Sequence, residues 1–194
     1  MRALTRCLSS TFCLGASLFA VSAALASDSA ALKRYELPNQ DTLEMTLPAG
    51  WEDQVEQPDG GGPPTIVMSI RPDGPRQVFI TPEWADPTAK QVRELAQLRD
   101  AIRDAAERVK PESVESYLEV RQLNGSNGVG YYFAATDRDP GADEFKFMNQ
   151  GALQVGSLTL WFTILANDGE DTVAVEALAM LQAARHRRTG LDQL

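Results

Sequence analysis

The side chains with the most evident potential for metal chemistry are four carboxylates in one short segment. They are Asp137, Asp139, Asp143 and Glu144. Oxygen ligands at alternating positions suit Ca²⁺, but Gly141 stands at the third position of that pattern and no glutamate follows in the register of the last calcium ligand. An exposed loop between two strands accounts for the same residues. Calcium binding by these four acids is therefore the weaker hypothesis, and no other metal and no cofactor is expected.

Nucleophilic catalysis finds little support in the sequence. The single histidine, His186, lies between arginines at the expected end of a helix, and no Gly-x-Ser-x-Gly segment presents a serine nucleophile. Both cysteines, Cys7 and Cys13, fall in the N-terminal leader described below. Carboxylates such as Glu115 and Glu119 are the remaining acid–base groups, so a carboxylate-dependent hydrolase is the alternative to a protein without enzymatic activity.

Four aromatic side chains are candidates for contact with a ligand or a protein partner. They are Trp51, Trp84, Tyr132 and Trp161. Aromatic rings contribute a large contact area at binding surfaces, which is why these residues predict a binding patch. Packing of a helix on a sheet accounts for the same residues and stays open as the alternative. The Gly- and Pro-rich residues 57–64 predict an acidic loop of undetermined role rather than a phosphate-binding loop, since Pro63 and Pro64 have no N–H to donate.

The N-terminal segment has the pattern of a secretory signal peptide. Arg2 and Arg6 precede an uncharged stretch from residue 7 to residue 25, and Ala24-Leu25-Ala26 forms an A-x-A cleavage site. We expect residues 1–26 to be removed, which leaves no cysteine, no disulfide and no stable membrane anchor. A short flexible segment (27–31), a single domain (32–188) and a tail (189–194) would follow. A periplasmic or secreted bacterial location is the prediction.

Charge and size narrow the possible partners. The chain has 194 residues, with 18 Lys and Arg against 27 Asp and Glu, giving a net charge of −9. Because two arginines lie in the leader, the remainder carries −11. A strongly acidic chain is unsuited to nucleic acid and to anionic membrane surfaces. An envelope protein or a small ligand is the expected partner.

Hydrophobic periodicity predicts the elements that position these residues. Alternating patterns indicate strands near residues 32–37, 42–47, 65–70, 77–81, 114–121, 129–136, 145–155 and 158–164. Apolar residues at three- and four-residue steps indicate helices over 88–109 and from about 168 through the arginines at 185–188. Thr88 and Gln91 form a capping box at the start of the first helix.

The connections between the expected strands are short, which favours antiparallel pairing. The predicted fold class is α+β: an α/β/α sandwich in which two main helices flank a mostly antiparallel sheet of six to eight strands. The segment Leu47-Pro48-Ala49-Gly50-Trp51, at the end of an amphipathic strand, resembles the L-P-x-G-W signature of the PsbP-like superfamily. The resemblance implies the same sandwich over residues 32 to about 184, and an assembly, binding or accessory role; it transfers no catalytic residue.

These observations together predict a secreted, non-enzymatic binding or accessory protein of the envelope. A carboxylate-dependent periplasmic hydrolase is the alternative, and a calcium-modulated binding module is a weaker one.

Overall fold

The protein is described here from a computed structural model, which covers residues 29–37, 41–71, 73–84 and 94–188. Its strands are β1 (Ala31–Glu36), β2 (Thr42–Leu47), β3 (Glu52–Glu56), β4 (Thr65–Ser69), β5 (Arg76–Trp84), β6 (Arg121–Gly125), β7 (Gly128–Thr136), β8 (Phe147–Val155), β9 (Leu158–Ala166) and β10 (Arg185–Arg187). Its helices are α1 (Leu95–Val109), the short 3-10 helix η2 (Lys110–Glu112) and α2 (Asp171–Ala183). No helix within these ranges has the length and apolar character needed to cross a bilayer.

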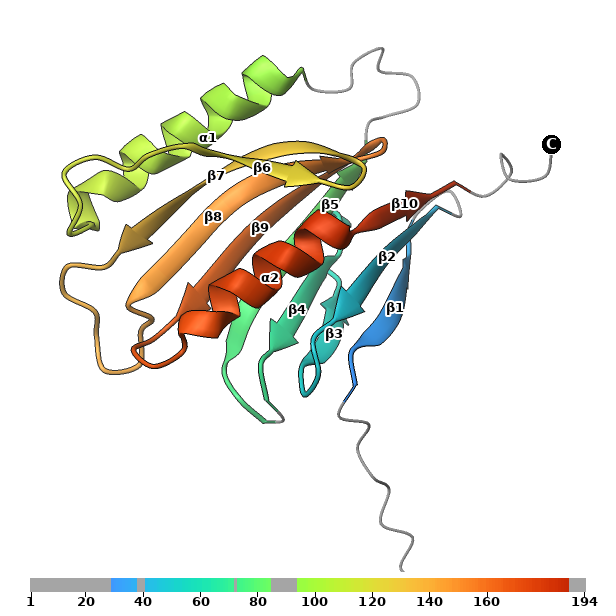
Figure 1. The fold of residues 1–194 in the computed structure, drawn as a ribbon, viewed down its shortest axis with the longest axis horizontal. Coiled ribbons are helices and arrows are strands. Elements are labelled where there is room, and N and C mark those ends of the chain that lie inside the picture. Colours follow the sequence, from blue (N-terminus) through green and yellow to red (C-terminus); the bar gives the residue numbers. More distant parts are fainter. Residues whose placement is uncertain (1–28, 38–40, 72, 85–93, 189–194) are drawn as a thin grey trace, which may run out of the picture.

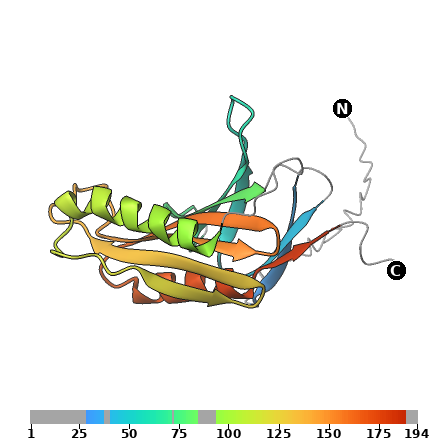
Figure 2. The same cartoon turned by 90° about the horizontal axis from the view of Figure 1, so that it is seen from above.

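The strands form two antiparallel sheets. The large sheet has seven strands in the order β3-β4-β5-β9-β8-β7-β6, and the small sheet has three in the order β1-β2-β10. Helix α1 lies on one face of the large sheet and α2 on the other, while the small sheet stands beside α2 (Figures 1 and 2). The predicted α+β sandwich is confirmed, and the large sheet has a number of strands within the predicted range. The difference is that β1, β2 and β10 form a separate sheet instead of joining the large one.

The period-two pattern of β9 shows why the sheet is covered on both faces. Leu160, Phe162 and Ile164 are buried in the core beneath α2, whereas Trp161 points to the α1 face. Strand β9 is paired on both sides, with β5 and with β8. The side chains of β9 therefore pack against the helical layers on both faces of the large sheet.

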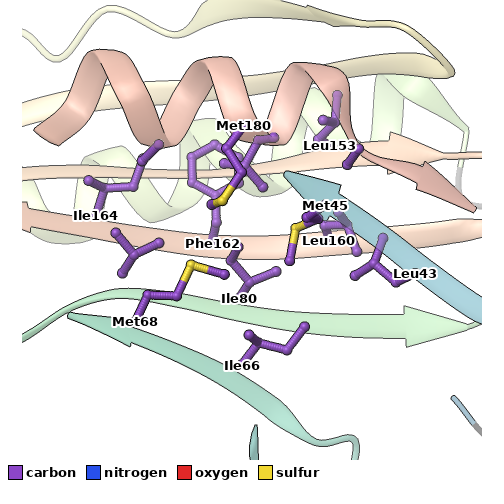
Figure 3. Close-up of a cluster of buried hydrophobic side chains, with 14 of the residues drawn as sticks. Leu43, Met45, Ile66, Met68, Ile80, Leu153, Leu160, Phe162, Ile164 and Met180 are labelled. Carbon is purple, nitrogen blue, oxygen red and sulfur yellow. The ribbon is translucent and has the colours of Figure 1, made fainter. Parts of the chain in front are cut away.

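Two separate hydrophobic cores follow from this arrangement. The larger joins α2 to both sheets, with contributions from β2, β4, β5, β8 and β9 (Figure 3). The smaller lies under α1, where Leu98, Ile102 and Ala106 meet Phe133 of β7 and Ala152 of β8. The four-residue spacing of the three α1 residues places them on one face of the helix. Each core holds one helix, so each face of the large sheet is stabilised independently.

The end of the second helix was predicted wrongly. Helix α2 ends at Ala183, Ala184 is extended (ψ 145°), and Arg185–Arg187 form β10. Strand β10 pairs with β2, placing Arg185 opposite Glu44 and His186 opposite Leu43. The sequence alone does not distinguish arginines at the end of a helix from arginines on an edge strand. In the structure, the edge of β2 that β1 does not occupy pairs with these residues as a strand.

Two further elements differ from the prediction. The expected strand over 114–121 is wrong: Val114 and Tyr117 are exposed, and β6 begins only at Arg121. The turn between β6 and β7 is Ser126–Asn127. Strand β3 was not anticipated, because Val55 is its only apolar residue. The predicted helix start at Thr88 and Gln91 lies outside the described residues.

Candidate functional site

The acidic segment found in the sequence forms one end of the large sheet. It joins the end of β7 to the start of β8, and its first residues are held against η2. The N–H of Val114 donates to the Thr136 carbonyl at 2.8 Å, and the N–H of Arg138 donates to the Glu112 carbonyl at 2.9 Å. An Arg138 guanidinium nitrogen donates to the carbonyl of the buried Ser113 at 2.6 Å. These contacts position the acidic loop beside the C-terminal end of α1.

A cavity of about 390 Å³ lies between this loop, η2 and the α1 face of the sheet. Its size falls in the range of small-molecule sites. Its apolar lining is Val109, Ala135, Phe145, Met148 and Leu165. Its acidic lining is Glu112, Asp137, Asp143 and Glu144. We call it the acidic cavity. The structure thus brings three of the four candidate calcium ligands around one hollow and leaves Asp139 out of its lining.

The charges on the acidic cavity are unevenly balanced. Lys146 is its only lining cation, and its ammonium is 2.9 Å from Asp168, which neutralises it. Asp137 and Glu144 accept loop N–H groups, from Asp139 at 2.9 Å and from Gly141 at 2.8 Å. The Asp143 carboxylate makes no hydrogen bond or ion pair with any described residue. The Glu112 carboxylate likewise makes no hydrogen bond or ion pair with any described residue. The rim is therefore negative, and two of its four carboxylates are unengaged.

The four carboxylates that line the acidic cavity are not arranged as a metal site. No group of three or more His, Cys, Asp or Glu side chains within the described ranges is arranged to hold a metal ion. The carboxylates of Asp137 and Glu144 are turned to backbone N–H groups of their own loop. Calcium binding stays a prediction that this geometry does not favour.

A second cavity, of about 240 Å³, opens on the α2 face of the same strand ends. Glu115, Thr136 and Glu170 are among its lining residues. Burial alone would raise the pKa of Glu115, but hydrogen bonds from the Thr136 N–H (3.0 Å) and hydroxyl (2.7 Å) outweigh it and lower that pKa. Glu115 is therefore held as a carboxylate.

The other carboxyl group with a shifted pKa lies in the small sheet. Hydrogen bonds from Arg34 and Arg187, each 3.1 Å from the Glu44 carboxylate, lower the pKa of Glu44. A general acid requires the opposite shift, toward higher pKa. Neither Glu44 nor Glu115 therefore has the raised pKa of a general acid.

The four candidate aromatic residues are distributed over the fold rather than gathered into one patch. Trp51, Trp84 and Tyr132 pack against the larger core on the α2 side of the sheet. Trp161 packs against the smaller core on the opposite face, and its indole N–H donates to Glu83 at 2.6 Å. All four are half-buried, and none lines the acidic cavity. Their role in binding stays a prediction.

The structure also assembles three residues that sequence reasoning left apart. His186 has a side chain only 3% exposed; its Nε2 lies 3.1 Å from an Asp41 carboxylate oxygen, and its Nδ1 lies 3.3 Å from the Ser157 hydroxyl. The Ser157 N–H also donates to Nδ1, at 3.4 Å. This Ser–His–Asp contact joins β10 to the β8–β9 turn. No local sequence motif predicts this contact, because its three residues are far apart in the sequence.

Comparison with known proteins gives one result about the fold. The chain is similar to the solution structure of cyanobacterial PsbP (CyanoP) from Synechocystis sp. PCC 6803, with 16% sequence identity and a TM-score of 0.48. The similarity covers 92% of this chain and 98% of that chain. No family model and no curated protein matches the sequence. The fold resembles PsbP, and nothing of that protein's activity is carried over.

Proposed function

We propose that the protein is an exported binding or accessory protein, without enzymatic activity, that holds a small ligand in the acidic cavity. The observation that carries the proposal is the cavity itself: an apolar floor of five side chains under a rim of four carboxylates. The leader sequence supports export. The lowered pKa values of Glu44 and Glu115 leave neither group suited to act as a general acid.

The lining chemistry selects the class of ligand. Val109, Met148 and Leu165 favour an apolar body, whose burial is worth about 25 cal/mol per Å². The carboxylate of Asp143 is free to pair with a positive charge on a ligand. Lys146 does not repel that charge, because its ammonium is paired with Asp168. The site therefore fits a small amphipathic cation, with an aliphatic or aromatic body and an ammonium or guanidinium end.

Three ligands of one shape test this proposal. Phenethylamine, 2-phenylethanol and phenylacetate share an aromatic body and differ in charge. In an NMR titration followed at the Met148 methyl group, we expect the amine to bind tightest and the acid weakest. Asp143→Asn is expected to weaken amine binding about two- to fivefold, as for an exposed ion pair, and to leave the alcohol unaffected.

The control is Asp139→Asn, which removes the same charge from the same loop at a residue that does not line the cavity. Equal affinity for all three ligands would reject the preference for a cation but would keep the acidic cavity as the binding site. Failure of every ligand to perturb Met148 would reject the cavity as the binding site.

Location and calcium are tested separately. Expression with its own leader in a bacterial host should release a periplasmic chain that begins at Ser27, as measured by intact mass. Calorimetry with Ca²⁺ should give no heat; a saturable heat lost in Asp143→Asn would instead favour the calcium-modulated module.

A further inference from the structure

The end of the large sheet opposite the acidic cavity carries a third hollow, which has basic instead of acidic lining residues. The two turns there, Ser126–Asn127 between β6 and β7 and Gly156–Ser157 between β8 and β9, touch through a hydrogen bond from the Gly156 N–H to the Asn127 carbonyl (3.1 Å). Strand β10 runs past them (Figure 1). Between the first turn and β10 lies a cavity of about 280 Å³, lined by Ser126, Asn127, Arg185, His186 and Arg187. We call it the basic cavity.

The walls of the basic cavity are fixed by the fold. The Ser126 N–H donates to the Gln182 carbonyl at 2.7 Å, and the Gln182 side chain donates to the Asn124 carbonyl at 2.8 Å, so the β6–β7 turn is tied to the end of α2. On the other side, His186 is held by Asp41 and Ser157. Its position in β10 sets the two flanking arginines on the opposite side of the strand from the core.

The polar groups around the hollow are mainly donors. Arg187 uses its Nε for Glu44 at 3.1 Å, which leaves its two terminal nitrogens. Arg185 makes no ion pair or hydrogen bond with any described residue, and the same holds for the side-chain amide of Asn127. No carboxylate lines the cavity. The residues that line the cavity thus supply two guanidinium groups and an amide but no carboxylate, and the nearby Glu44 carboxylate is already bound by Arg34 and Arg187.

We propose that the basic cavity binds a phosphate group. The planar fork of a guanidinium matches phosphate oxygens in pairs, and charge-assisted hydrogen bonds of this kind are about twice as strong as neutral ones. The negative charge of the whole chain does not oppose this, because a contact within the cavity is short compared with the Debye length of about 8 Å that screens the distant carboxylates. The site is independent of the acidic cavity, which lies at the opposite end of β8.

The test is an NMR titration of the purified protein with inorganic phosphate at constant ionic strength. We expect saturable shifts of the Asn127 side-chain amide and of the Arg185 and Arg187 Nε–H signals. Arg185→Gln should weaken binding about tenfold or more, because it removes a charge-assisted fork. Arg188→Gln makes the same charge change next to the cavity without lining it, and should alter affinity less than about twofold.

Two outcomes overturn the proposal: shifts that never saturate, or equal weakening by Arg185→Gln and Arg188→Gln. Arg185→Lys keeps the charge and loses the fork, so affinity restored only in part supports paired recognition. Flotation with phosphatidylglycerol vesicles separates the sources of the phosphate. Flotation lost in Arg185→Gln but kept in Arg188→Gln assigns a lipid headgroup, whereas phosphate binding without flotation assigns a soluble phosphate ester.

Discussion

At the scale of single residues, Glu44 is a carboxylate held by two arginines. Its side chain is 11% exposed and lies between the guanidinium groups of Arg34 and Arg187, which come from the two outer strands of the small sheet. One carboxylate on the middle strand therefore ties β1 and β10 together across β2. Because both arginines are more than half exposed, solvent screens much of the attraction.

Replacement of Glu44 should destabilise the protein in a pH-dependent way. The folded state lowers the pKa of this carboxyl, so its contribution is present above the ordinary glutamate range and is lost as the pH falls through the folded pKa. We expect Glu44→Gln to reduce the free energy of unfolding by about 1 kcal/mol at pH 7 and by much less at pH 3. Urea unfolding at both pH values measures this.

Glu36→Gln is the matched control on the neighbouring strand, since Glu36 is exposed and, among the described residues, its carboxylate accepts a hydrogen bond only from the Thr42 hydroxyl, at 3.4 Å. A loss at Glu44 that is equal at the two pH values would contradict the assignment.

At the scale of elements, α1 is attached to the sheet by a narrow apolar stripe. Leu98, Ile102 and Ala106 are fully buried against β7 and β8, whereas Leu95 at the helix start is 38% exposed. The stripe and its spacing were visible in the sequence, and so were the alternating patterns of β7, β8 and β9. These elements were predicted because each concentrates apolar residues in one continuous segment, and in α1 and β9 the burial is also periodic.

The helix should depend on the stripe and not on hydrophobicity in general. Leu98→Ala is expected to lower the free energy of unfolding by about 2–5 kcal/mol, because a fully buried leucine leaves a cavity. Leu95→Ala removes the same atoms from an exposed position of the same helix and should cost less than about 1 kcal/mol. Similar losses for the two variants would mean that α1 does not dock on the sheet as described.

What the sequence did not reveal at this scale depends on pairing between distant segments. Strand β10 has three residues with no apolar pattern, and β3 has a single apolar residue, so neither has a periodic signal. The cavities and the Ser157–His186–Asp41 contact combine residues from separate elements. Of the features that form these cavities and this contact, only the acidic loop was visible in the sequence as a candidate site, because its four carboxylates lie close together in the sequence.

At the scale of the whole molecule, the small sheet is joined to the large sheet by a shared core and by polar contacts. The small sheet shares the larger core through Leu43, Met45 and Leu47. One polar link is His186, between Asp41 and Ser157. A second is Asp53 of β3, which accepts from the Tyr35 hydroxyl at 2.9 Å and pairs with Lys33 at 2.8 Å. Charge is also distributed unevenly over the molecule, with carboxylates around one end of β8 and arginines around the other.

Removal of this histidine should loosen the junction between the sheets. We expect His186→Ala to lower the free energy of unfolding by about 2–3 kcal/mol, because it leaves the Ser157 N–H without its acceptor and opens a cavity. Hydrogen exchange should rise first at the amides of β10. Ser157→Ala keeps the N–H contact and should cost about 1 kcal/mol or less; an equal or larger loss in this variant would contradict the central position of the histidine.

The pairing of β5 with β9 has a consequence for biosynthesis. Strand β5 ends at Trp84 and its partner begins at Leu158, and the small sheet joins β2 to residues as late as Arg187. A polypeptide delivered from its N-terminus thus cannot close either sheet until almost all of it has emerged. Non-local pairing of this kind slows folding. In the meantime the β2 and β5 edges stay open, and a nascent chain halted before the last strand would be a substrate for chaperones and proteases rather than a smaller folded protein.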